Sequence, residues 1–321
     1  MNDREQFYKE FYSALEKGME PSGGHLIEMD IPKNNGSVKG ITIKFDNIAL
    51  APTVNPDIYY QDWKDGQLMS DIVSGIRSEL IKTVPGLSHF NVGSIKRDSA
   101  ITHLHAAVVG YENNKGWLKD IPHERLADLA VFAKWKFDNA DPDLVVASKI
   151  TEPLLAQLRL TKEEALKIAK ANTARSARFE SMDTVMKNMM VDDGMGKELA
   201  EMMFPAQSTS LSVLTNESGI DGAALIACPE VLKAVQKEIG EDFYILPSSI
   251  HEVLILPKSF TDDVEDLKQM VSSINEAEVP PEDRLSDNVY EFDGHSLKLA
   301  GVADLKQEHN ISDSITHHRS R

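Results

Sequence analysis

Two very apolar runs, separated by a short polar segment, constrain the fold of this chain more than any other feature. They are Phe243–Leu246 and Ile250–Leu256, within the stretch FYILPSSIHEVLILP. Short apolar runs that contain β-branched residues are typical of buried strands. Burying the polar residues between them without hydrogen-bond partners would cost on the order of 1–3 kcal/mol each. The polar segment must therefore lie at an exposed turn or form a paired network.

The polar segment Ser248–Glu252 is the main candidate for a functional site. If the second strand begins at residue 250, Ser249 and His251 share one face and Glu252 points to the other. Ser249 and His251 then lie roughly 7 Å apart along the strand, which is too far for a nucleophile–base hydrogen bond unless the chain bends. Three interpretations stay open: a hydrolase site with Ser248, Ser249 and His251, a binding surface, and a structural turn whose hydroxyls cap backbone groups.

Familiar catalytic motifs each fail at an identifiable residue. Gly194–Lys197 resembles the end of a phosphate-binding loop, but Val191 replaces its first glycine and Glu198 replaces the Ser or Thr that would hold magnesium. His251 is followed by glutamate as in zinc proteases, but Ile255 stands where the second histidine belongs. No Gly-x-Ser-x-Gly elbow is present. The sequence predicts no catalytic residue, and its enzyme status stays undecided.

A histidine pair is the best candidate for a metal site. His103 and His105 lie two residues apart in the predicted strand Ala100–Tyr111, so they share a face at a spacing that can chelate a metal. A third ligand would have to come from elsewhere, for example His123 or His251. Surface or core histidines explain the pair equally well. We expect neither a metal nor a cofactor.

The charge balance limits the choice of partners. The chain has 34 Lys and Arg against 51 Asp and Glu, which gives a net charge of −17. Binding nucleic acid requires clustered cations, so we expect no nucleic-acid partner. The acidity favours solubility, or alternatively an acidic mimic of nucleic acid. The single cysteine, Cys228, cannot form an internal disulfide, and no apolar run approaches the roughly 20 residues of a membrane span. Together with the charged N-terminus, which lacks a signal-peptide pattern, this predicts a cytoplasmic protein without membrane contact.

Residues 1–87 predict an N-terminal lobe with the order α-β-β-α. Helical periodicity covers residues 3–18 and 68–84, and a hairpin turns at Asn35-Gly36, the preferred dipeptide of a type I′ turn. Between the hairpin and the second helix lies a turn-rich segment with three aromatic residues, Tyr59, Tyr60 and Trp63. These rings can form a recognition surface or pack over the hairpin.

Residues 88–300 predict the main body, and the class is α+β with antiparallel or mixed sheets and packed helices. The order strand, helix, strand, strand, helix occurs in both 100–173 and 209–292, which indicates a possible internal duplication. A helical segment, 178–204, joins the two and contains seven of the twelve methionines. A methionine-rich face suits varied partners, although it can also fill an irregular core. Residues 301–321 form a polar tail.

Several short segments carry a resemblance to a known family over roughly residues 5–292. They are Asn34–Gly36, Ala51–Thr53, Gly110–Asn114, Ile121–His123, Asp128–Ala130, Ala171–Thr173, Leu214–Asn216, Gly222–Ala224, Phe243–Pro257 and Leu285–Tyr290. In this order and spacing the chain resembles the bacterial family catalogued as domain of unknown function 5688, and the PSSIHE segment is its most specific part. The resemblance implies a bacterial cytosolic origin and supplies no catalytic residue.

The leading interpretation is a non-enzymatic protein-binding or regulatory module whose partner is another protein. The absence of catalytic motifs, the aromatic turn, the methionine-rich helix and the acidic composition motivate it. We expect binding residues among Ser248, Ser249, His251, Glu252, Tyr59, Tyr60 and Trp63. A hydrolase centred on the two serines and His251, and an acidic nucleic-acid mimic, are the alternatives. The oligomeric state is not predicted.

Overall fold

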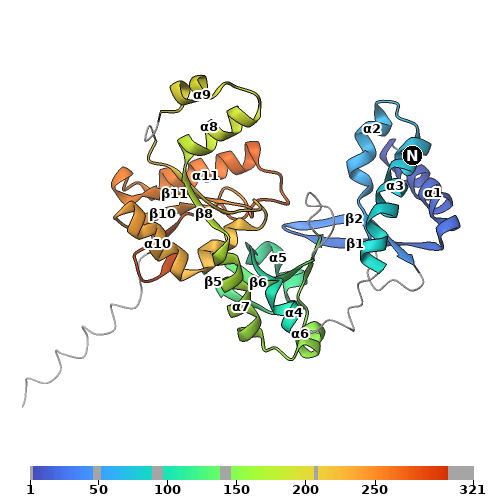
Figure 1. Ribbon diagram of the computed structural model, residues 1–321, viewed down its shortest axis with the longest axis horizontal. Helices are drawn as coiled ribbons and strands as arrows, with labels where there is room; N and C mark the ends of the chain where they lie inside the picture. The colour runs from blue at the N-terminus through green and yellow to red at the C-terminus, as the bar shows by residue number, and fades with distance from the viewer. Residues whose placement is uncertain (1–2, 46–51, 89–96, 138–145, 206–208, 303–321) are drawn as a thin grey trace, which may run out of the picture.

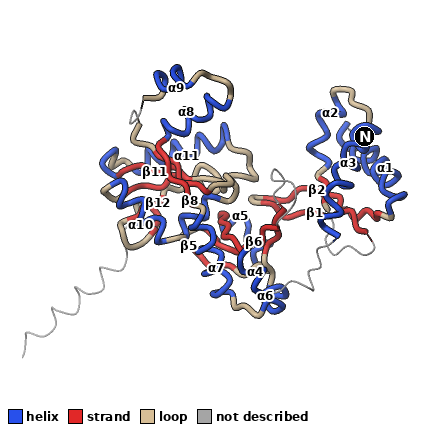
Figure 2. Tube along the Cα trace, in the orientation of Figure 1, coloured by secondary structure: helices blue, strands red, loops and turns tan. Residues whose placement is uncertain are grey.

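The computed structural model describes residues 3–45, 52–88, 97–137, 146–205 and 209–302 (Figure 1). The predicted polar tail lies almost entirely outside these residues. Helices make up 48% of the structure and strands 26%, with several antiparallel sheets. The α+β class predicted from the sequence is confirmed. Figure 2 shows the strands in three separate groups, each with helices around it.

The N-terminal lobe combines three helices with a small antiparallel sheet. Its elements are α1 Asp3–Met19, η1 Glu20–Ser22, β1 Gly24–Lys33, β2 Gly36–Phe45, β3 Thr53–Val54, η2 Pro56–Tyr59, α2 Tyr60–Lys64 and α3 Met69–Ser88. The hairpin register places Lys33 opposite Gly36, and Asn35 has a positive φ of 58°. The hairpin forms as expected, but its two turn residues are Asn34 and Asn35 and Gly36 lies in β2 without a positive φ, so the type I′ turn expected at Asn35-Gly36 is wrong. Phe7, Phe11 and Ile43 are fully buried in the core of this lobe.

The middle of the chain forms a four-stranded antiparallel sheet in which β6 is central. Its elements are α4 Arg97–Thr102, β4 Leu104–Gly110, α5 Tyr111–Leu118, β5 His123–Leu126, β6 Leu129–Phe137, β7 Val146–Lys149, α6 Glu152–Leu158 and α7 Lys162–Arg175. β6 pairs with β4 along one edge and with β5 and β7 along the other. α7 begins with a capping box between Thr161 and Glu164.

The C-terminal part contains a six-stranded sheet in the order β13-β12-β10-β11-β9-β8. Its elements are β8 Ala177–Ser181, α8 Met182–Asp192, α9 Lys197–Met203, β9 Ser212–Asn216, η4 Gly222–Ala227, α10 Pro229–Ile239, β10 Phe243–Leu246, β11 Val253–Pro257, η5 Lys258–Phe260, α11 Val264–Glu278, β12 Tyr290–Phe292 and β13 Leu297–Leu299. The two apolar runs, β10 and β11, pair antiparallel near the middle of this sheet.

Three local sequence interpretations are wrong. The short apolar run Ala223–Ala227 is typical of a buried strand and is interpreted as one from the sequence, but it forms the fully buried 3₁₀ helix η4, because an all-apolar run carries no periodicity that separates the two. Ala100–Thr102 belongs to α4, so the predicted strand begins at Leu104. Ile250–Glu252 also lies outside β11, which begins at Val253.

The two sequence segments with the order β-α-β-β-α share a strand order. The middle sheet has the order β4-β6-β5, and the corresponding strands of the second segment have the order β9-β11-β10. In both, the third strand lies between the first and the second and is antiparallel to each. The internal duplication stays a prediction, and this common topology supports it.

Candidate functional site

The polar segment between β10 and β11 is a compact loop fixed by its backbone. The amide of Ser249 donates to the carbonyl of Glu252 at 3.2 Å, and the amide of His251 donates to Ser249 Oγ at 3.0 Å. The amide of Ile250 donates to the carbonyl of Asp283 at 2.7 Å. These bonds divert the chain from a strand, so the alternation of faces assumed for residues 250–252 does not apply.

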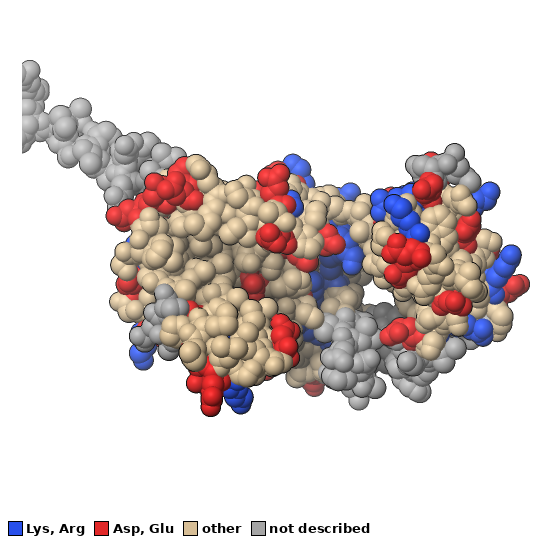
Figure 3. Space-filling view, turned by 90° about the horizontal axis from the view of Figure 1, so that it is seen from above, with Lys and Arg blue, Asp and Glu red and all other residues tan. Residues whose placement is uncertain are grey.

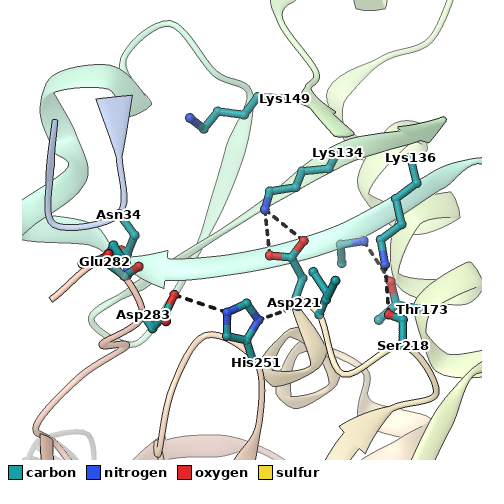
Figure 4. A network of polar contacts seen from close by, with 12 residues as sticks. Asn34, Lys134, Lys136, Lys149, Thr173, Ser218, Asp221, His251, Glu282 and Asp283 are labelled. Atoms are coloured by element: carbon teal, nitrogen blue, oxygen red, sulfur yellow. Dashed lines mark hydrogen bonds and ion pairs between the residues drawn. The ribbon is translucent and has the colours of Figure 1, made fainter. Parts of the chain in front are cut away.

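The imidazole of His251 bridges two other segments of the chain. Its Nδ1 lies 3.3 Å from the backbone nitrogen of Asp221, and its Nε2 lies 3.3 Å from Asp283 Oδ1 (Figure 4). Because the amide of Asp221 can only donate, Nδ1 accepts, and Nε2 carries the proton that it donates to Asp283. Ser249 contacts the backbone of His251, so in this geometry its hydroxyl is not paired with the ring. The hydrolase alternative stays a prediction.

Asp221 forms a buried ion pair with Lys134 of β6. Lys134 Nζ lies 2.7 Å and 2.9 Å from the two carboxylate oxygens, and Asp221 is 5% exposed. Asp221 has a left-handed φ of 58°, which is strained for a residue other than glycine. The next residue, Gly222, packs so closely on the carbonyl of His251 that a Cβ atom would clash with it. The ion pair and this close contact hold the His251 loop against the middle sheet.

A row of basic side chains crosses the middle sheet above this ion pair. His105 of β4 and Lys149 of β7 both lie directly opposite Lys134, so all three share one face. Lys136 follows on the same face, two residues along β6. Burial, and then the charges of Lys134 and Lys33, lower the pKa of Lys149 to about 8. Burial also lowers the pKa of Lys136. This face therefore concentrates positive charge in an acidic chain.

The tip of the β1–β2 hairpin reaches from the N-terminal lobe to the body (Figure 1). Asn34 Nδ2 donates to the carbonyl of Arg284 at 2.7 Å and to that of Glu282 at 3.0 Å. Asn35 Nδ2 also donates to the carbonyl of Arg284 at 2.7 Å, and the Asn35 amide donates to Asn114 Oδ1 at 2.9 Å. These asparagines therefore have a second role besides turn formation, because they hold the lobe against residues 281–284.

Asp128 ties the middle sheet to the C-terminal sheet. This carboxylate follows β5 and accepts hydrogen bonds from Ser286 Oγ at 3.0 Å, Asn288 Nδ2 at 3.0 Å and Tyr290 OH at 2.7 Å. Tyr290 is fully buried, and burial together with the charge of Asp128 raises its pKa. A single side chain thus fixes residues 286–290 against the turn that enters β6.

An apolar groove of about 430 Å³ lies on the other side of the Pro247–Glu252 segment. α11 forms one wall through Met270 and Ile274, and Phe260 closes one part of it. These three side chains are 52%, 45% and 63% exposed, respectively. Pro247 and Ser248 line the groove too. The segment predicted as a site therefore borders two different features, the groove and the His251 bridge.

The methionine-rich helices α8 and α9 lie at the surface, on the same side of the molecule as α11 (Figure 1). None of the six methionines in these helices is buried, nor is Met195 between them, and Met202 is 80% exposed. The interpretation that these residues fill an irregular core is wrong. The interpretation of these residues as a face that suits varied partners agrees with the exposure of their side chains.

Acidic residues surround the apolar features. Residues 262–278 contain six acidic residues and one lysine, so their net charge is 1 − 6 = −5. Residues 192–201 contain four acidic residues and one lysine, so their net charge is 1 − 4 = −3. Figure 3 looks down on this side and shows a broad area of uncharged residues with groups of Asp and Glu around it. The nucleic-acid mimic stays a prediction, because it requires acidic side chains in rows that match phosphate spacing.

The aromatic turn packs on the first helix, in the same apolar cluster as Ile41 and Ile43 of the hairpin. Tyr60 and Trp63 lie 5.3 Å and 5.5 Å from the ring of Phe7, and Tyr59 stacks on Phe11 at 5.7 Å. All three rings of the turn are partly exposed. Their suggested role in binding stays a prediction.

The histidine pair lies where the sheet meets α4. Within the described ranges, no group of three or more His, Cys, Asp or Glu side chains is arranged to hold a metal ion. Burial, then the neighbouring Lys136 and His103, lower the pKa of His105 to about 4. None of the helices in the described ranges combines the length and hydrophobicity that a membrane span requires.

These features define an α+β protein in which two antiparallel sheets and a helical lobe meet at one polar junction. The chain belongs to DUF5688, a family of unknown function whose model matches residues 4–294. No curated protein and no solved structure matches the chain. Several of the segments that carried the resemblance contact one another: Asn34–Gly36 with Gly110–Asn114, Gly222–Ala224 with Phe243–Pro257, and Asp128–Ala130 with Leu285–Tyr290.

Sequence reasoning missed the basic row and its acidic partner. Lys134 and Lys136 flank Trp135 in the otherwise apolar strand β6, and this alternation was the signal available. The local sequence does not distinguish Asp221 and Asp283, because each lies in a polar turn and many other acidic residues of the chain do so too. Their roles depend on loops that come together only in the fold.

We expect His105→Gln to make the fold less sensitive to acid. The pKa of His105 is about 4 in the folded chain against about 6.5 when unfolded. As the pH falls from 7 to 5, His105 becomes protonated in the unfolded chain but stays neutral in the folded chain. The free energy of unfolding of the wild type therefore decreases. After allowance for partial exposure, this loss is about 1 kcal/mol.

Urea unfolding of the wild type and the variant at both pH values measures this difference. His25→Gln, at an exposed position of β1, is the matched control. Between pH 7 and pH 5 it should lose as much stability as the wild type does. Equal losses in all three proteins would contradict the assignment.

Proposed function

We propose that the chain is a protein-binding module whose apolar groove holds a basic amphipathic helix of a partner protein. The observation that supports this is the groove itself, in which large apolar side chains remain about half exposed beside an acidic helix. An amphipathic helix binds such grooves by placing its apolar face inside and its charged face at the rim.

The exposed apolar side chains supply the attraction. Phe260, Met270 and Ile274 leave much of their surface in water, which is unfavourable unless a partner covers them. Full burial of such a side chain is worth about 1.5–3 kcal/mol, so covering the exposed half stabilises a complex by about 1 kcal/mol per side chain. Contiguous apolar surface with a polar rim is typical of interaction sites. The methionines of α8 and α9 extend the apolar surface on this side, and their flexible side chains can adapt to different partners.

The acidic rim supplies the selectivity. α11 and the residues before it carry a net charge of −5, so cationic side chains of a partner helix gain favourable contacts along its edge. Such contacts raise the association rate and exclude acidic partners more than they raise affinity. Binding should weaken as salt rises from about 0.05 M to about 0.5 M, because exposed charges are screened.

A designed peptide tests the proposal directly. The probe is the synthetic amphipathic peptide LKKLLKLLKKLLKL with a fluorescent label, and its binding to the full chain is followed by fluorescence anisotropy. We expect Met270→Glu to weaken binding at least about tenfold, because a carboxylate replaces an apolar contact inside the groove. Leu68→Glu is the matched control, since Leu68 is 65% exposed in the N-terminal lobe.

The two variants separate groove binding from simple charge attraction. Both add one negative charge to an acidic protein, so non-specific attraction of the peptide would become stronger in both. Binding in the groove becomes weaker in Met270→Glu alone. An acidic peptide, LEELLELLEELLEL, should not bind. Equal affinity of the two variants for the basic peptide would overturn the proposal.

A further inference from the structure

The basic row on the middle sheet has no part in the groove. Its three lysines, Lys149 on β7 and Lys134 and Lys136 on β6, are called the lysine row below. Directly opposite residues in a sheet lie about 5 Å apart, and alternate residues along a strand about 7 Å apart. Lys149 Nζ now lies on Pro32 and Lys136 Nζ on Ser218, and at this spacing the long side chains can reach one ligand by rotating away from these contacts. Figure 4 shows the row above the His251 bridge, with the hairpin tip beside it.

The charges of the lysine row are only partly balanced. Lys134 is paired with both oxygens of Asp221. Within the described part of the chain, the other two ammonium groups contact no carboxylate oxygen. Lys136 lies on Ser218 Oγ at 3.5 Å, and Lys149 lies on the carbonyl of Pro32 at 3.1 Å and 4.4 Å from the centre of the Trp117 ring. Carboxylates outnumber basic side chains by seventeen, so pairing both lysines would have been easy. A partly buried cation without a counter-charge is unfavourable.

The lysine row also lies at a sheltered place. Figure 3 shows Lys and Arg side chains gathered in the hollow between the body and the N-terminal lobe. The hairpin reaches Lys149 through Pro32 and residues 282–284 through Asn34. A ligand on the row would therefore lie between the sheet and the hairpin, where water screens charges less than at an open surface.

We propose that the lysine row is a binding site for a small ligand that carries linked phosphate groups, such as a triphosphate. An ammonium group offers three donors and acts as a point charge, which suits phosphate oxygens in several orientations. The row has three ammonium groups, one of them already shared with Asp221. It therefore suits a compact ligand with several negative charges better than a ligand with a single carboxylate. This site is separate from the groove, and neither proposal depends on the other.

Isothermal titration of the full chain with inorganic triphosphate tests the site. EDTA is present so that divalent cations do not link the ligand to Asp221 or Asp283. We expect Lys136→Gln and Lys149→Gln each to weaken binding about tenfold, because each removes one cation from the row. Lys64→Gln is the matched control and should bind as the wild type does, since Lys64 is exposed on α2 in the N-terminal lobe.

Three further comparisons decide the result. Circular dichroism of each variant shows whether it is folded, and Met270→Glu in the groove should leave triphosphate binding unchanged. ATP should compete with triphosphate for the same site. Absence of triphosphate binding at millimolar concentration, or equal binding by the lysine variants, would overturn the proposal. Binding of a single-stranded oligothymidylate without binding of triphosphate would overturn it as well, since the site would then require a polynucleotide.

Discussion

Replacing Asp128 with alanine should lower the free energy of unfolding by about 3–5 kcal/mol, one of the largest effects expected for a single polar residue here. This carboxylate accepts hydrogen bonds from three side chains of the segment that enters β12. Hydrogen bonds to a charged acceptor are worth about 1.5–3 kcal/mol each, and they are not additive. Loss of the acceptor also leaves the buried hydroxyl of Tyr290 without its partner.

Urea unfolding followed by tryptophan fluorescence measures the change. Tyr290→Phe is the informative comparison, because it removes one donor together with its need for a partner. It should cost only about 1 kcal/mol. The loss of stability in Asp128→Asn should lie between those of Asp128→Ala and Tyr290→Phe, since the amide keeps one acceptor oxygen. If Asp128→Ala and Tyr290→Phe were equally stable, the hydrogen bonds from Ser286 and Asn288 would not contribute to stability.

The second large effect is expected for Lys134→Met. The substitution keeps a long apolar side chain on β6 but leaves Asp221, at 5% exposure, without its cation. Removing one partner of a buried ion pair destabilises proteins by about 3–5 kcal/mol, because the remaining charge is unpaired. Lys134 is more exposed than Asp221, with 22% of its side chain accessible, so we expect a value near the lower limit.

A double-mutant cycle separates the charge effect from lost packing. Asp221→Asn keeps the side-chain shape and tolerates the left-handed backbone, so its own effect should be smaller. Lys134→Met/Asp221→Asn should recover much of the loss of Lys134→Met, because no buried charge remains. Thermal unfolding of the four proteins gives the coupling energy. A double variant as unstable as the sum of the two single variants would show that the pair is not coupled.

Sequence reasoning succeeded where a few neighbouring residues determine the structure. The helices predicted over residues 3–18 and 68–84, and the hairpin between them, follow from local periodicity and local turn residues. It failed at Ala223–Ala227, where every residue is buried and periodicity is lost. The start of β11 was also misplaced, because a long-range hydrogen bond from Ile250 to Asp283 ends the loop.

The site was harder to predict than the fold for the same reason. Lys134 and Asp221 are 87 residues apart, and His251 and Asp283 are 32 apart. No pattern within a sequence window connects them, since strand register and loop packing bring them together. The Pro247–Glu252 segment could be singled out because polar residues interrupt two apolar strands. Which neighbours it would meet could not be read from the chain.

The contact of the hairpin tip with the body also sets an order for folding. Asn34 and Arg284 are 250 residues apart. At synthesis rates of about 5–20 residues per second, the partner of the tip leaves the ribosome about 10–50 seconds after the hairpin. The N-terminal lobe has its own core around Phe7 and Phe11, so it can fold during this interval. The side-chain amides of Asn34 and Asn35 then stay hydrated until residues 281–284 arrive, and formation of these hydrogen bonds becomes one of the final steps of assembly.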